Sequence, residues 1–106
     1  MKKIDFQGWP SGDSKPVIEL GFSLAEIEQR YELKFFRDRD DLDWFHVTYL
    51  DDINVGSIVF MKYENSPASG VIMYVDSLVD TKEAINKIKQ LLDIDNNDIL
   101  WKQSEI

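Results

Sequence analysis

Three successive apolar runs in the middle of the chain constrain its fold more than any other feature. They span Trp44 to Leu50, Ser57 to Tyr63 and Val71 to Val75, and polar segments separate them. Runs of this length, bounded by Asp, Asn, Gly, Ser and Pro, are typical of β-strands joined by turns. The sequence therefore predicts an antiparallel meander over residues 44–76. The second run is almost wholly apolar, so we expect it in the middle of the sheet, covered on both faces.

Two helices are predicted, one before the meander and one after it. Ser23 is followed three residues later by Glu26, a capping box that predicts a short helix over residues 24–31. Asp80 and Glu83 repeat this pattern before a second, longer helix. The apolar stripe of that helix has a 3.6-residue period and consists of Ala84, Ile85, Ile88, Leu91 and Leu92. We expect the longer helix to lie across the sheet.

Short strands and an irregular arm complete the predicted fold. The arm covers residues 1–16, which contain Gly8, Pro10, Gly12 and Pro16. The further predicted strands are Lys3 to Phe6 within the arm, Val17 to Leu20, Leu33 to Arg37, and Ile99 to Trp101, the last being either a strand or a packed tail. The sequence thus predicts one α+β domain over residues 1–106. Its antiparallel sheet has about four to five strands, with the short N-terminal and longer C-terminal helices packed on it.

The charge of the chain limits its partners. The 106 residues include 20 acidic and 12 basic side chains, giving a formal net charge of −8. Such a surface repels phosphate backbones and anionic lipids, so we expect neither nucleic acid nor a membrane as partner. A basic protein is the natural complement. The absence of cysteine, of an apolar secretion signal and of a long apolar run favours a cytoplasmic location.

Chemical motifs are weak throughout the chain. Asp93, Asp95 and Asn97 have the spacing of the first ligands of a calcium loop, but Asp98 and Ser104 occupy its glycine and glutamate positions. His46 is the only histidine and falls in an alternating strand, which favours a structural role. We therefore expect no catalytic residue, no metal site and no cofactor. Paired carboxylates for a small hydrolase remain the open alternative among enzymes.

The predicted meander brings acidic segments together. With strands running alternately up and down, the loops at 38–43 and 64–69 share one end of the sheet, and the second helix returns to that end. Only Arg37 and Arg39 offset the acids expected there. The candidate partner-binding residues are Asp38, Asp40, Asp41, Asp43, Glu64, Asp93, Asp95 and Asp98, with Trp44 beside them as an aromatic anchor. The alternatives are a solvated polar end without a specific role and a core or edge position for Trp44.

Part of the chain resembles a known class of small bacterial proteins. The segment from Val17 to Ile27 has the pattern apolar-x-Leu-Gly-x-Ser-x-x-Glu-Ile, and Val47 to Asp52 and Val55 to Phe60 follow it as a hairpin. Together with the acidic charge, this is similar to immunity proteins of polymorphic toxin and contact-dependent growth inhibition systems. The resemblance covers residues 17–76 and implies a cytoplasmic inhibitor of one cognate toxin, often a basic nuclease. It transfers no site residue.

Two functional hypotheses follow from the sequence. The first is an immunity protein that neutralises a basic toxin through its acidic end, without enzymatic activity. The alternative is a regulatory adaptor that binds its partner by extending the edge of a sheet. The first predicts association that weakens with salt, and the second predicts backbone pairing with little salt dependence.

Overall fold

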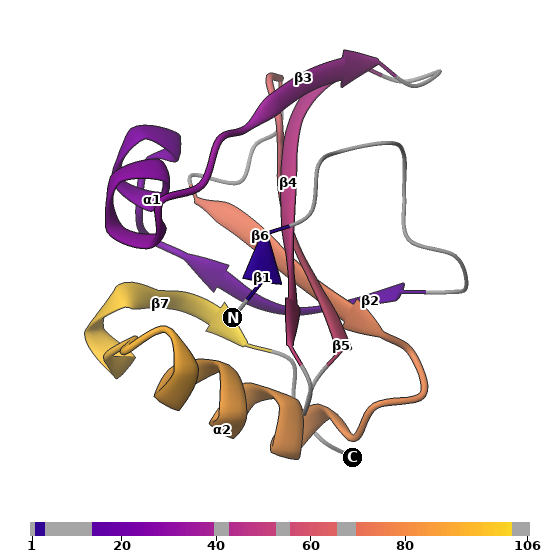
Figure 1. Ribbon diagram of the computed structural model, residues 1–106, viewed down its shortest axis with the longest axis vertical. Helices are drawn as coiled ribbons and strands as arrows, with labels where there is room; N and C mark the ends of the chain where they lie inside the picture. Colours follow the sequence, from indigo (N-terminus) through magenta and orange to yellow (C-terminus); the bar gives the residue numbers. More distant parts are fainter. Residues whose placement is uncertain (1, 4–13, 40–42, 53–55, 66–69, 103–106) are drawn as a thin grey trace.

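The computed structural model describes residues 2–3, 14–39, 43–52, 56–65 and 70–102 (Figure 1). These form a sheet with two helices and one short 3₁₀ turn. In chain order the elements are β1 (Lys2–Lys3), β2 (Ser14–Leu20), α1 (Leu24–Tyr31), β3 (Phe36–Arg39), β4 (Trp44–Asp52), β5 (Gly56–Tyr63), β6 (Val71–Asp76), α2 (Thr81–Leu91), η1 (Asn96–Asp98) and β7 (Ile99–Lys102).

The sheet is antiparallel throughout the described pairs. Its strands follow the order β1-β4-β5-β6-β2-β7, and β3 pairs with β4 beside this path. The α+β class and the meander of β4, β5 and β6 are therefore as predicted. The sheet has more strands than the four to five expected, because the short strands β1, β2, β3 and β7 all join the meander in one sheet.

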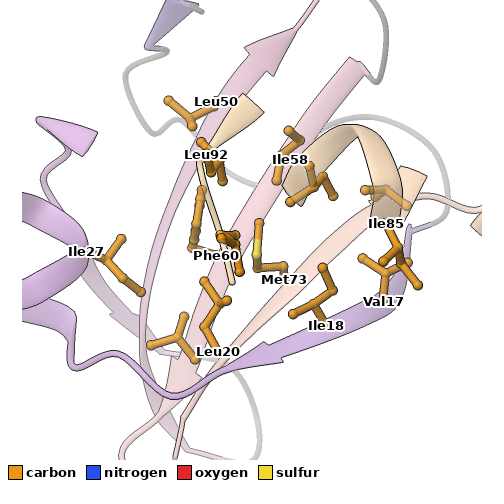
Figure 2. Packing of buried hydrophobic residues seen from close by; sticks show 14 of the residues in the cluster. Val17, Ile18, Leu20, Ile27, Leu50, Ile58, Phe60, Met73, Ile85 and Leu92 are labelled. Carbon is orange, nitrogen blue, oxygen red and sulfur yellow. The ribbon is translucent and has the colours of Figure 1, made fainter. Parts of the chain in front are cut away.

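Both helices pack on the same face of the sheet. Ile27 of α1 and Ile88 of α2 are fully buried in one cluster with Phe60 and Met73 of the central strands. Figure 2 shows these sheet side chains packed with Ile85 and Leu92. Burial of such side chains contributes the largest favourable term to folding. The amphipathic stripe of α2 thus lies against the sheet as the sequence predicts.

The other face of the sheet carries a smaller apolar cluster. Its buried members are Phe45, Val47, Tyr49, Val59 and Met61, and neither helix contributes to it. Because β5 places Ile58 and Phe60 in the first cluster and Val59 and Met61 in this one, it is covered on both faces. The prediction of a central β5 is confirmed.

The helix start signals are confirmed with one difference. Ser23 Oγ accepts from the Glu26 amide at 3.1 Å, and the Glu26 carboxylate accepts from the Ser23 amide at 3.1 Å. At α2, Asp80 accepts from the Glu83 amide at 2.9 Å. The structure shows no return bond from the Glu83 side chain, which instead pairs with Lys87 at 2.9 Å. The capping box predicted at Asp80 is therefore only half formed.

Several strand boundaries differ from the prediction. The expected strand at Leu33 to Arg37 is displaced, since β3 covers Phe36–Arg39 and pairs Arg39 with Trp44. The charged residues of β3 adopt the strand conformation because pairing with β4 outweighs their low intrinsic preference for β-structure. Residues 14–16, expected in the arm, belong to β2 because they pair with β6. The predicted strand at Lys3 to Phe6 is seen at Lys2–Lys3, and its remainder lies outside the described residues.

Among the residues that the structure describes, no helix is both long enough and apolar enough to cross a membrane.

Candidate functional site

The β3–β4 hairpin carries an aromatic ring that contacts two guanidinium groups. The Arg37 guanidinium carbon lies 4.1 Å from the centroid of the Trp44 ring, and that of Arg39 lies 5.6 Å from it. Cross-strand pairing of Arg39 with Trp44 and of Arg37 with His46 sets these side chains on one face. Trp44 remains 38 % exposed. Trp44 is therefore partly exposed on a strand that is paired on both sides, and the orientation of its ring is held by cation–π contacts.

Glu64 joins this aromatic group to β5. Its carboxylate accepts from Arg37 Nε at 2.6 Å and from Nη2 at 3.2 Å, and lies 3.1 Å from His46 Nε2. The hydrogen bond from Arg37 lowers the pKa of Glu64, and the same bond raises the pKa of Arg37. We call Arg37, Arg39, Trp44, His46 and Glu64 the Trp44 cluster. The carboxylate of Glu64 is thus already paired with a cationic side chain of the same fold, Arg37.

The other acids predicted at this end have mixed positions. Asp43 accepts from the amide and the side-chain nitrogen of Asn65 at 2.8 and 2.9 Å, which ties the start of β4 to the end of β5. Asp38 is exposed within β3 and caps the amide of Arg39 at 2.8 Å. Asp40 and Asp41 lie outside the described residues. The charged segment 38–43 is thus partly strand, where a loop was expected.

Both helices end in the same kind of turn, with an acid where glycine is usual. Leu33 N–H donates to Glu28 O at 3.1 Å after α1, and Ile94 N–H donates to Lys89 O at 3.0 Å after α2. In each turn, the residue just before the donor has the left-handed backbone conformation: Glu32 with φ 54° and Asp93 with φ 52°. A side chain other than glycine is strained there, and a negative charge opposes the helix dipole.

Two further acids follow α2 in the 3₁₀ turn η1. Asp95 accepts from the Asn97 amide at 3.4 Å, and Asp98 accepts from the Asp95 amide at 3.1 Å. No cationic side chain forms an ion pair with Asp93, Asp95 or Asp98 within the described part of the chain. We call Glu32, Asp93, Asp95 and Asp98 the helix-end acids. Since η1 leads directly into β7, these charges border the edge of the sheet.

A tyrosine connects the two helix ends. The Tyr31 hydroxyl donates to the Leu92 carbonyl at 2.9 Å, joining the last residue of α1 to the first residue after α2. Partial burial raises the pKa of Tyr31; Arg30 opposes this, while Asp98 and Asp93 add to it. Asp93 and Asp98 therefore lie close enough to the Tyr31 hydroxyl for their charges to disfavour its ionisation.

The structure separates the predicted acids into two groups. In Figure 1 the β3–β4 hairpin lies at the top, whereas the turn between α2 and β7 lies at the lower left. The expected single acidic end rested on the alternating directions of the strands alone. The second helix does return the chain to the end of the sheet where β6 begins. Leu20 pairs with Val71 at the start of β6, and the amide of the next residue, Gly21, donates to Asp98 O at 2.7 Å. Twist and the lateral offset of β2 and β7 carry this group away from the hairpin.

The sequence interpretation missed Glu32. The signal was present in Tyr31-Glu32-Leu33 and Leu92-Asp93-Ile94, two segments in which an acid stands between apolar residues just after a helix. Leu33 and Ile94 are buried, which is the hydrophobic contact that accompanies such turns.

Within the described residues, no three histidine or acidic side chains are arranged as metal ligands. Comparison of the chain with protein-family models, with curated proteins and with solved structures finds no match in any of the three.

Proposed function

We propose that this protein is a cytoplasmic immunity protein that binds and neutralises a cognate basic toxin, such as a nuclease. The observation that carries this proposal is the placement of the helix-end acids. Three of them have no cationic partner in the described structure, and Glu32 and Asp93 also adopt a strained backbone conformation. Local features that lower stability are typical of functional surfaces.

The physical basis is electrostatic complementarity. The C-termini of α1 and α2 add the negative ends of their dipoles to the carboxylates of Glu32 and Asp93. The basic surface of a nuclease would otherwise contact the phosphates of its substrate. Binding of that surface to the carboxylates of this region therefore competes with the nucleic acid. The net charge of −8 steers the encounter from a distance.

The Trp44 cluster supplies a different kind of contact in this proposal. Trp44 is held by Arg37, which is held in turn by Glu64, so little side-chain freedom is lost when a partner covers the ring. Tryptophan and arginine are the residue types that most often dominate interface energies. The cluster therefore serves as an aromatic anchor, while the helix-end acids provide long-range attraction.

The test has two stages. A tagged form of the chain is used to isolate partners from its native lysate at low salt, and each basic partner is then expressed with and without the chain. We expect one partner that stops growth alone and permits growth when the chain is coexpressed. Failure of every isolated partner to inhibit growth would overturn the proposal.

The surface is tested with charge reversals once that toxin is known. The double variant Glu32→Lys with Asp93→Lys should slow association about tenfold at low salt, and salt should reduce the difference. The control Asp51→Lys with Glu83→Lys changes the net charge equally at exposed positions elsewhere. Reversal of Asp40, Asp41 and Asp43 tests the hairpin in the same assay. Equal rates for the helix-end variant and its control would exclude the helix ends as the interface.

A further inference from the structure

A row of basic side chains crosses three strands on one face of the sheet. His46 of β4 lies opposite Arg37 of β3 on one side and opposite Lys62 of β5 on the other. Directly opposite residues of an antiparallel pair point to the same face. Lys62 therefore joins the face that carries the Trp44 cluster, and its side chain is half-buried there.

A second row beside the first contains one acid. Arg39 lies opposite Trp44, and Glu64 follows on the far side of Trp44, where its amide donates to the Trp44 carbonyl at 3.0 Å. The Glu64 carboxylate is occupied by Arg37 of the first row. Within the described part of the chain, no carboxylate forms an ion pair with Arg39. These two rows are thus locally basic on a chain whose net charge is −8, and Arg39 stands beside a partly exposed aromatic ring.

We propose that this face binds a partner segment in which a carboxylate stands beside an apolar side chain. The carboxylate pairs with the Arg39 guanidinium, whose planar donors match its two oxygens, and the apolar side chain covers the Trp44 ring. Arg37 stays between Glu64 and Trp44, so the ring is already held in place before the partner binds.

The charge of the whole chain favours this partner over a nucleic acid. A nucleic acid would bring a row of phosphates, which a molecule of net charge −8 repels from a distance. A single carboxylate on a protein that is otherwise neutral or basic meets little of that repulsion, because only its local surroundings at Arg39 act on it strongly.

The inference rests on the proposed function, since it names the chemistry that the Trp44 cluster recognises as an anchor. The two are nevertheless tested separately. A failure of this face to bind a carboxylate leaves the growth test and the helix-end variants unaffected, and the absence of a toxic partner leaves the binding of a peptide to this face unaffected.

The test is an NMR titration of the isotopically labelled full chain with the acetylated and amidated peptide Leu-Glu-Leu. We expect a dissociation constant of about 1–10 mM, with the largest shifts at the Trp44 indole N–H and the Arg39 Nε–H. The neutral peptide Leu-Gln-Leu should bind about threefold more weakly, as the loss of an exposed ion pair predicts. Equal binding of the two peptides, no shift at about 10 mM peptide, or inorganic phosphate bound as tightly as Leu-Glu-Leu would each overturn the proposal.

Variants then locate the contact. Arg39→Gln should weaken binding of Leu-Glu-Leu about threefold, to the level of the neutral peptide. Arg30→Gln is the matched control, because Arg30 is also exposed and lies on another aromatic ring, 4.4 Å from the centroid of Phe22. An equal loss in both variants, or no loss in Arg39→Gln, contradicts the assignment to Arg39. The amide spectrum of each variant shows whether it is folded.

Discussion

At the scale of single residues, close packing decides what the backbone accepts. Gly70 is buried at the start of β6, and its amide donates to the Glu19 carboxylate at 3.1 Å. A Cβ atom at this position would overlap the carbonyl oxygen of Leu20 in the neighbouring strand. Since both groups belong to paired backbones, neither can move without disturbing the pairing of β2 with β6.

Gly70→Ala should therefore destabilise the fold by about 3 kcal/mol, the upper part of the range for overpacked sites. The measurement is urea unfolding followed by circular dichroism. Gly56→Ala is an informative comparison, because a Cβ there meets no atom within 4 Å but is strained by the φ of 85°. A smaller loss for Gly70→Ala than for Gly56→Ala would mean that strand β2 adjusts.

Tyr31 makes stability depend on alkaline pH. Burial raises its pKa above the ordinary value of 10.0, so the folded chain retains this proton to higher pH than the unfolded chain. Its contribution is complete below about pH 10 and is lost as the pH rises through the folded-state pKa.

Tyr31→Phe removes the hydrogen bond to Leu92 O and should cost about 1 kcal/mol at pH 7. The difference from the wild type should narrow above about pH 10, because the variant has no phenol to ionise at this site. Urea unfolding from neutral to alkaline pH measures this. Burial also raises the pKa of Tyr74, which lies in β6 away from the helix ends. Tyr74→Phe is therefore the comparison for a buried phenol at another site. A pH-independent difference for Tyr31→Phe would contradict the assignment.

At the scale of elements, the helix starts and helix ends follow opposite rules. Ser23 and Asp80 satisfy free amides at the helix starts, as stability requires. Glu32 and Asp93 stand at positions where glycine and a positive charge are favourable. The starts could be read from sequence because a cap acts within three residues. The ends differ from the usual pattern, and their connection through Tyr31 arises only when both helices dock on the sheet.

Asp93→Asn should stabilise the protein by about 0.5 kcal/mol, because it removes a negative charge from the end of α2. Asp93→Gly removes the same charge and also relieves the left-handed strain. It should therefore stabilise the protein by about 0.5 kcal/mol more than Asp93→Asn does, once the entropic cost of glycine is subtracted. Thermal unfolding of both variants measures the two effects separately. If both variants are less stable than the wild type, Asp93 makes a favourable contact. Under the proposed function, each gain in stability is accompanied by slower toxin association.

At the scale of the whole molecule, the net charge of −8 opposes a compact state. The acids are distributed over the described elements, and the radius of gyration is 12.8 Å. Charges on a molecule of this size lie within a few screening lengths of one another, about 10 Å in 0.1 M salt, so their repulsion responds to ionic strength.

Raising NaCl from about 20 mM to about 500 mM should increase the midpoint of thermal unfolding by about 2–5 °C. The double variant Glu32→Gln with Asp93→Asn removes two negative charges and should respond less. Differential scanning calorimetry measures both proteins. A midpoint that falls with salt would show that attractive ion pairs, such as Arg37 with Glu64, outweigh the repulsion.

Local patterns determined the meander, the bounds of α1, the stripe of α2 and the central position of β5, because period, capping and turn chemistry act over a few residues. Tertiary structure alone decided that β2 adds to β6 and that β7 adds to β2, since these depend on partners distant in sequence. That Phe36–Arg39 is a strand depends on its pairing with β4 in the next segment of the chain. Of the predicted acids, Asp38, Glu64, Asp93 and Asp95 are exposed in the described structure, and the assembled sheet decides which of them are neighbours. The order of strands and turns along the sequence indicates the direction of each strand. The twist of a sheet arises only when the strands are assembled side by side.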